Sequence, residues 1–262
     1  MEIKTTSYSK YFPEDRVMDI YIPDSKPKEL VFVFIHGGGW YAGSRAGWAG
    51  NAKYYCERGH LCFSIDYRLV PKHLYPAQIE DSRLAMSYIK SIIGDFSITK
   101  PRYVLLGSSA GGHLVALLST IDANDDLGMT DEVKIRDTKP DYTVCYCPVT
   151  TMSIWENSAL HIPKIIKDFM GVTEEEDPKL YEKASPLRRI KGNEPAFLFL
   201  HGSEDETVPV WHSQKMHEEL LKAKGISRLE ILHGEKHGFG YGIKTKGQIS
   251  ALNIIEDFLP EV

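Results

Sequence analysis

Residues 102–111, RYVLLGSSAG, decide the fold of this 262-residue chain. An apolar, β-branched run predicts a buried strand that ends at Gly107, and a helical pattern begins at Ala110. Gly107-Ser108-Ser109-Ala110-Gly111 fits the pattern G-x-S-x-G, in which a tight turn between strand and helix lifts one serine above the edge of the sheet. Glycine at both ends removes the Cβ atoms that would collide in such a turn. Ser109 is therefore the predicted nucleophile.

Similar apolar runs lie on both sides of this one, and patterns of helical spacing separate them. Runs without alternation predict strands covered on both faces, as in a parallel sheet. Strands alternating with helices predict an α/β fold with a mostly parallel, doubly wound sheet and helices on both faces. Pro76 is expected to open the first helix, and Gly94 to end it. The expected strands are 17–22, 30–35, 61–65, 102–106, 142–147, 196–200 and 228–232, and the expected helices are 76–93, 110–120, 211–224 and 248–259.

One stretch, 150–190, breaks this alternation. No repeat or linker divides the chain, so we expect one domain over residues 1–262. The stretch is too long for a plain connection, and we interpret it as a small cap insertion. It holds a helical piece at 162–170 and an acidic run, Glu174 to Asp177, that predicts the start of a solvated helix. Whether this segment covers the site stays open.

His36-Gly37-Gly38-Gly39 follows the apolar run at 30–35. Successive glycines let backbone N–H groups approach a substrate carbonyl with no side chain in the way. We predict an oxyanion hole made by the N–H groups of Gly38, Gly39 and Ala110, each worth about 3–4 kcal/mol. Trp40, directly after the glycines, is predicted either to wall the substrate pocket as a substrate-binding residue or to be a packing tryptophan.

A serine nucleophile needs a base, and the base needs a carboxylate behind it. Asp205 follows the strand at 196–200, flanked by Glu204 and Glu206, and His237 follows the strand at 228–232. The order Ser, Asp, His predicts the triad Ser109, Asp205 and His237. Five other histidines compete with His237 and are interpreted as structural, as part of the helix after the nucleophile, or as helix-surface residues: His201, His233, His113, His212 and His217.

Composition narrows the function classes. A net charge of −5 with no basic stripe argues against nucleic acid as a partner. Residues 1–7 lack the apolar core of a signal peptide, and no apolar run approaches the roughly 18 residues of a membrane span. Cys145 and Cys147, two apart in an expected strand, would face the same way, and we expect reduced cysteines in a cytoplasmic protein. No metal or cofactor is expected, and a homodimer is left open.

With these motifs in place, the chain resembles the esterase/lipase branch of the α/β-hydrolases. The likeness is strongest to small carboxylesterases with an HGGG-type oxyanion loop, including acetyl-xylan- and feruloyl-esterase-like members. Asp66-Tyr67-Arg68-Leu69 and residues 75–81, YPAQIED, look like the stretch that those enzymes carry before the elbow. In the family pattern G-x-x-D-x-x-V-P the acid falls on Asp205, and the histidine before Gly-Phe falls on His237. The resemblance spans residues 30–259 and implies an α/β-hydrolase fold.

The resemblance implies a serine hydrolase that cleaves short-chain acyl esters through an acyl-enzyme, with sugar acetates among the expected substrates. Its lipase-like members carry a longer N-terminal cap, so any cap here is expected from 150–190, which argues against long-chain lipids. Trp40 is also similar to its counterpart in kynurenine formamidases, so an arylformamidase is the nearest alternative. A peptidase and a non-catalytic binding protein are weaker alternatives.

Overall fold

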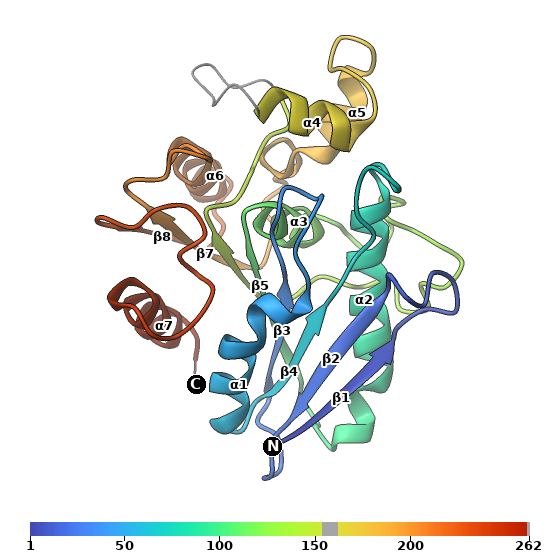
Figure 1. Cartoon of the computed structure of the whole chain (residues 1–262), viewed down its shortest axis with the longest axis vertical. Helices are drawn as coiled ribbons and strands as arrows, with labels where there is room; N and C mark the ends of the chain where they lie inside the picture. The colour runs from blue at the N-terminus through green and yellow to red at the C-terminus, as the bar shows by residue number, and fades with distance from the viewer. Residues whose placement is uncertain (154–161, 261–262) are drawn as a thin grey trace.

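The computed structural model describes residues 1–153 and 162–260, and its centre is one eight-stranded sheet. The strand order is β1-β2-β4-β3-β5-β6-β7-β8, with β1 and β2 antiparallel to their neighbours and every later pair parallel (Figure 1). The predicted α/β fold with a mostly parallel sheet is confirmed. The strands are β1 Glu2–Ser7, β2 Val17–Ile22, β3 Leu30–Ile35, β4 Leu61–Ile65, β5 Arg102–Ser108, β6 Tyr142–Tyr146, β7 Ala196–Gly202 and β8 Ser227–Leu232.

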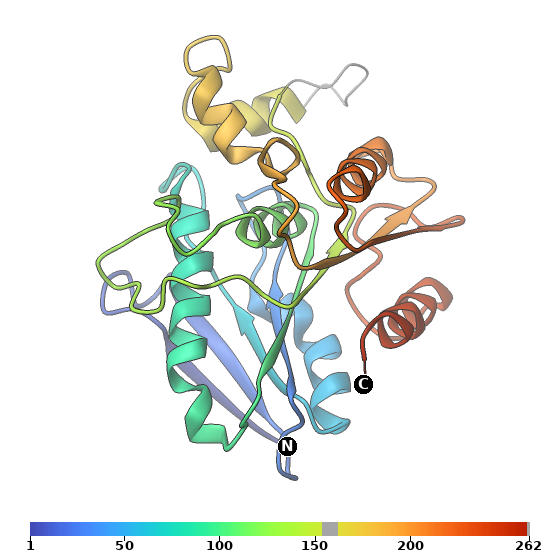
Figure 2. The same ribbon diagram turned by 180° about the vertical axis from the view of Figure 1, so that it is seen from behind.

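Helices cover both faces of the sheet (Figures 1 and 2). The central strands β3 and β4 are buried at every residue, which is why their sequences are apolar at every position except Ser64. Apolar side chains of α2, α3 and α6 pack in one core, and those of α1 and α7 pack in a second core on the opposite face. The bounds are α1 Ala49–Glu57, α2 Ala77–Ile92, α3 Ala110–Ser119, α6 Trp211–Lys222 and α7 Lys246–Phe258.

The sequence patterns missed the strand β1 and the helix α1, and helix limits differ from the expected ones by one or two residues. β1 is an edge strand with mostly exposed polar residues, and α1 buries only part of one face, so neither gives an apolar signal. Pro76 lies just before α2 rather than in it. The helix ends at Ile92, within one residue of the expected end, but Gly94 is not its left-handed cap. The chain continues as a 3₁₀ turn, Ile93–Phe96, and the left-handed residue is Ser97, with φ 59°.

The helices α4 Ile162–Met170 and α5 Pro178–Ala184 lie beyond the carboxyl ends of the parallel strands (Figure 1). Residues 154–161 of the expected insertion fall outside the described residues. The acidic run ends at Asp177, whose Oδ1 accepts the Leu180 N–H at 2.9 Å and caps α5, so the helix begins after the run. In the described part of the chain, no helix combines the length and apolar character that crossing a bilayer requires.

Cys145 and Cys147 do not face the same way, contrary to the prediction. Strand β6 ends at Tyr146, and Cys147 has a left-handed backbone with φ 44°, so the alternation of side chains stops before it. Cys145 packs in the core of α2 and α3, whereas Cys147 packs in the core of α1 and α7. All four cysteines of the chain are free and buried.

Candidate active site

Ser109 lies on the turn between β5 and α3 with φ 57° and ψ −118°. This backbone conformation is strained for any residue other than glycine. The turn depends on close backbone approach at both flanking glycines. A Cβ on Gly107 would lie 2.3 Å from the Gly111 carbonyl oxygen, and one on Gly111 would lie 2.2 Å from the Ile35 carbonyl oxygen. No side chain fits at either position, so the elbow predicted from the pattern has a steric cause.

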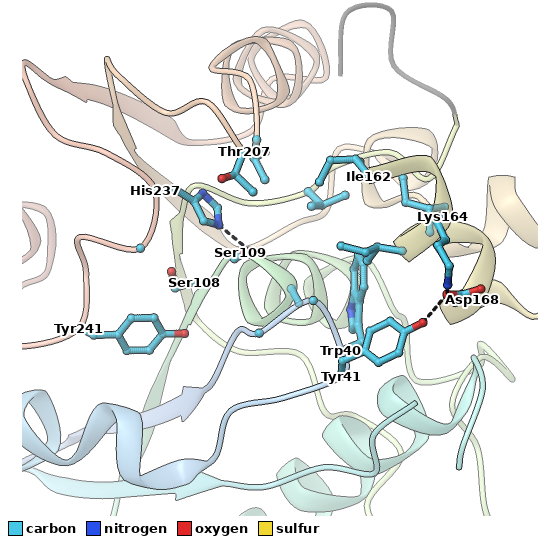
Figure 3. Close-up of a pocket in the computed structure, with 18 residues that line it drawn as sticks. Trp40, Tyr41, Ser108, Ser109, Ile162, Lys164, Asp168, Thr207, His237 and Tyr241 are labelled. Carbon is cyan, nitrogen blue, oxygen red and sulfur yellow. Dashed lines mark hydrogen bonds and ion pairs between the residues drawn. The ribbon is translucent and has the colours of Figure 1, made fainter. Parts of the chain in front are cut away.

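The structure brings the three predicted triad residues into one chain of hydrogen bonds. Ser109 Oγ is 2.9 Å from His237 Nε2 (Figure 3), and His237 Nδ1 is 2.7 Å from Asp205 Oδ2. A carboxylate only accepts, so Nδ1 carries the proton and donates it, which leaves Nε2 to accept from the serine. This is the tautomer in which a histidine can remove the serine proton.

Asp205 accepts hydrogen bonds from other groups besides His237. Its Oδ1 accepts the N–H groups of Thr207 and Val208, each at 2.9 Å. Burial alone raises the pKa of Asp205, but hydrogen bonds from His201, His237 and the Val208 N–H outweigh it and leave the pKa well below its ordinary value. Asp205 is therefore ionised at neutral pH, while Glu204 and Glu206 are exposed.

His201 is a further part of this site that the sequence patterns classed only as structural. It is fully buried, and its Nε2 lies 2.9 Å from the Val208 carbonyl and 3.4 Å from Asp205 Oδ2. Because the carbonyl and carboxylate both accept, Nε2 carries a proton, and Nδ1 accepts from Ser213 Oγ at 2.7 Å. His201 thus supports the same carboxylate oxygen that His237 contacts, a contact that sequence spacing alone does not reveal.

The other four histidines that competed with His237 lie outside the triad. His212 was predicted at a helix surface, but it is fully buried, and its Nδ1 faces the backbone N–H and hydroxyl of Thr150. His113 is buried in α3 and contacts the Ala184 carbonyl at 2.8 Å, and burial lowers its pKa to about 4. His217 is half-buried and pairs with Ser227, and His233 is exposed.

The glycine loop after β3 lies beside Ser109. Gly38 and Gly39 have φ of 111° and 62°, and a Cβ on Gly38 would lie 2.2 Å from the Ala42 carbonyl oxygen. Ala110 is the first residue of α3, so its N–H has no acceptor within the helix. These three residues line the same cavity as Ser109 and His237. Their N–H groups are the ones that the sequence predicts for an oxyanion hole, and that role stays a prediction.

The cavity measures about 600 Å³, and most of its wall is apolar. On the side opposite His237, the wall is made by the loop after β3 and by α4 (Figure 3). Trp40 both lines the cavity and packs, because its ring stacks on Phe169 of α4 with centroids 4.2 Å apart. Tyr41 donates to Asp168 at 2.6 Å and ties α4 to the same loop. The described part of the insertion thus contributes to the cavity through Ile162, Ile165 and Ile166.

A metal ion has one conceivable set of ligands among the described residues, namely Cys147, Asp205 and His237, whose ligand atoms lie within 4.8 Å of one another. Both ring nitrogens of His237 and both carboxylate oxygens already have hydrogen-bond partners. Burial raises the pKa of the Cys147 thiol, which opposes the thiolate that a metal needs. The arrangement fits a hydrogen-bonded triad better than a metal site.

Comparison with known families gives a match over most of the chain. The family model BD-FAE matches residues 18–220, a range that includes the glycine loop, the serine elbow and Asp205. His237 lies beyond the matched range, so its placement rests on the geometry above.

Named relatives and solved structures agree with this match. The chain is similar to esterase LipC of Mycobacterium tuberculosis, with 32% identity over 81% of this chain and 52% of the relative. It is similar to esterase LipQ of the same organism, with 28% identity over 97% of this chain and 62% of the relative. The chain therefore spans about half to three fifths of the length of these two relatives. The apo form of Thermogutta terrifontis esterase 2 superposes with a TM-score of 0.81 at 25% identity, covering 98% of this chain and 93% of that one.

Proposed function

This chain belongs to the BD-FAE family, and from that premise we propose that it is a serine carboxylesterase that cleaves small, uncharged esters with short acyl chains. The observation that carries the proposal is the hydrogen-bonded chain from Ser109 through His237 to Asp205 at the wall of an apolar cavity. The esterase names of the relatives LipC and LipQ support the same reaction class.

In the proposed mechanism, His237 takes the proton of Ser109, and the serine oxygen attacks the ester carbonyl. The N–H groups of Gly38, Gly39 and Ala110 stabilise the charge on the tetrahedral intermediate. Asp205 keeps the proton on Nδ1 and stabilises the imidazolium. His237 then protonates the leaving alcohol, an acyl-enzyme forms, and water activated by His237 releases the acid. No step calls for a metal or cofactor.

The choice between ester and formamide hydrolysis is tested by two substrates on one enzyme. We expect kcat/KM on p-nitrophenyl acetate to exceed kcat/KM on N-formylkynurenine by at least about tenfold, a ratio of the size that contacts in a substrate pocket give. The reasons are that the cavity wall is mostly apolar and that an ester carbonyl is more reactive than a formamide carbonyl. Active enzyme is counted first with a fluorophosphonate probe. A preference for the formamide would replace the esterase by the arylformamidase, and an intact protein that takes no label would favour a binding protein.

We further propose that the insertion at 150–190 acts as a small cap on one domain, residues 1–262. The support is the contact of α4 with the site: Ile165 Cγ2 lies 3.7 Å from the position of a Cβ on Gly39. The side chains of α4 therefore limit the space above the oxyanion loop.

Ile165→Trp tests this role of α4. The larger ring is expected to fill part of the cavity and to lower kcat/KM on p-nitrophenyl hexanoate by about tenfold or more, while hydrolysis of the acetate changes by less than about threefold. Lys167→Trp is the matched control, because Lys167 lies on the exposed side of the same helix. Equal losses on both esters would show that Ile165 does not set acyl length.

We place the proposed reaction in the cytoplasm. The support is that all four cysteines are free and buried, as is usual in a reducing compartment.

A further inference from the structure

Tyr241 holds the glycine loop of the site, although the proposed reaction gives it no part. It follows His237 by four residues and lines the cavity (Figure 3), and its Oη accepts the Gly37 N–H at 2.6 Å. A Cβ on Gly37 would lie 2.9 Å from that oxygen and 3.2 Å from Ser109 Cβ. Gly37 thus lies between the phenol and the nucleophile.

The ring of Tyr241 is itself fixed on the core. It packs on buried Trp48 with centroids 4.6 Å apart, and the indole N–H of Trp48 donates to the Ile35 carbonyl at 3.0 Å. Ile35 is the last residue of β3, which leads into the glycine loop. Trp48 therefore contacts both the ring of Tyr241 and the strand that leads to Gly37. The hydroxyl therefore approaches the loop from a rigid support.

The backbone around Tyr241 is fastened on both sides. Asn51 is 2% exposed, and its Oδ1 accepts the Gly242 N–H at 2.9 Å, while its Nδ2 donates to the Gly240 carbonyl at 3.3 Å. Gln248 Nε2 donates to the Tyr241 carbonyl at 2.7 Å. These contacts join the loop that carries the proposed base to α1 and α7, so the position of the phenol is set by the fold.

A run of three glycines has no side chains to fix its peptide planes, so contacts with other residues must set the orientation of those planes. Tyr241 accepts the N–H of Gly37, and His36 Nδ1 lies 2.8 Å from the Gly37 carbonyl, which accepts. The second of these peptide planes carries the N–H of Gly38. Two successive planes are therefore set, and the second of them carries the first of the proposed donors. Burial raises the pKa of Tyr241, so the phenol is neutral at the pH of an assay.

We propose that Tyr241 is a positioning residue for the oxyanion hole. This inference rests on the proposed hydrolase function. By accepting the Gly37 N–H, the phenol directs the loop so that the N–H groups of Gly38 and Gly39 meet the oxyanion, and it couples that loop to the loop of His237. The contact supports the charged intermediate more than the bound ester, so its loss lowers kcat rather than raising KM.

Tyr241→Phe removes the hydroxyl and keeps the ring on Trp48. We expect kcat on p-nitrophenyl acetate to fall about 10- to 100-fold with KM within about twofold, since loss of a whole donor costs about 10²- to 10³-fold and here the donors remain but are misdirected. The pH profile keeps its shape, because the phenol does not titrate in that range. The control is Tyr54→Phe, because the hydroxyl of Tyr54 donates to Glu256 and not to the glycine loop. The kinetics of this variant should match those of the wild type.

The rate of labelling by a fluorophosphonate is measured on the same variants, because phosphonylation also develops charge in the oxyanion hole. It should fall with kcat in Tyr241→Phe. If the wild type labels but hydrolyses no ester, the esterase proposal fails, while the ratio of labelling rates still decides the role of Tyr241. Labelling within twofold of the wild type, or a rise in KM at constant kcat, overturns the positioning role, and a wild type that neither labels nor hydrolyses overturns both proposals.

A second measurement tests the contact itself and shows whether the variant is folded. Amide exchange of Gly37, followed by NMR on glycine-labelled protein, should be slow in the wild type and at least about tenfold faster in Tyr241→Phe, because the amide loses its acceptor. Equal exchange in the two proteins would contradict the contact on which the inference rests.

Discussion

Ser109→Ala is expected to lower kcat on p-nitrophenyl acetate by about 10⁴- to 10⁶-fold, as removal of a nucleophile does when triad residues act as a unit. The oxygen that His237 Nε2 faces at 2.9 Å is lost, and no covalent intermediate forms. Since the cavity and the glycine loop remain, substrate binding should survive. Steady-state kinetics on purified protein of unchanged melting temperature measures the effect.

Ser108→Ala is the matched control for this prediction. Ser108 is the neighbouring serine, and it is fully buried at the end of β5, one residue before the elbow. This variant should still take a fluorophosphonate label, whereas Ser109→Ala should take none. Near-normal activity in Ser109→Ala, or a label on Ser108, would show that the nucleophile has been assigned to the wrong residue.

Asp205→Asn is expected to lower kcat by about 10⁴-fold while the fold is retained. The N–H groups of Thr207 and Val208 both point at Oδ1, so they select the amide oxygen for that position. The amide nitrogen then faces His237 Nδ1, which must accept and can no longer carry the proton. The histidine proton moves to Nε2, where it faces the serine and blocks proton transfer.

Glu204→Gln and Glu206→Gln are the controls for Asp205, because they change the neighbouring acids, which are exposed. Both should keep kcat within about twofold, the usual size of a surface change away from the reacting atoms (within about 0.5 kcal/mol). A large loss in either control, with Asp205→Asn unaffected, would move the acid to that glutamate.

Much of the fold was predictable because buried parallel strands leave a strong signal. β3, β4 and β5 are apolar along nearly their whole length, and their ends fall where the patterns place them, within one or two residues. β1 and α1 were missed because an exposed edge strand and a helix with few buried positions resemble loops. The side of the sheet that Cys147 faces depends on one left-handed residue, which no periodicity predicts.

For the site, the sequence predicted which residues meet but not what supports them. The motifs place Ser109, Asp205 and His237 at strand ends, and the structure brings them within hydrogen-bond distance; their catalytic roles stay predictions. His201 and Tyr241 carry no motif of their own, because their contacts depend on how the loops fold back over the strand ends. The contribution of α4 to the cavity likewise depends on packing, which spacing does not encode.

The close approach of Gly111 to the Ile35 carbonyl has a consequence for how the site forms. The turn that presents Ser109 is shaped by a neighbouring strand about seventy positions earlier, and the phenol that steadies Gly37 arrives from 204 positions later. No local segment can therefore build the reactive geometry by itself. When the protein is diluted out of denaturant, we expect its activity to return only after the central sheet has formed, and not after any single helix has formed. The rate at which activity returns would therefore measure the folding of the whole domain.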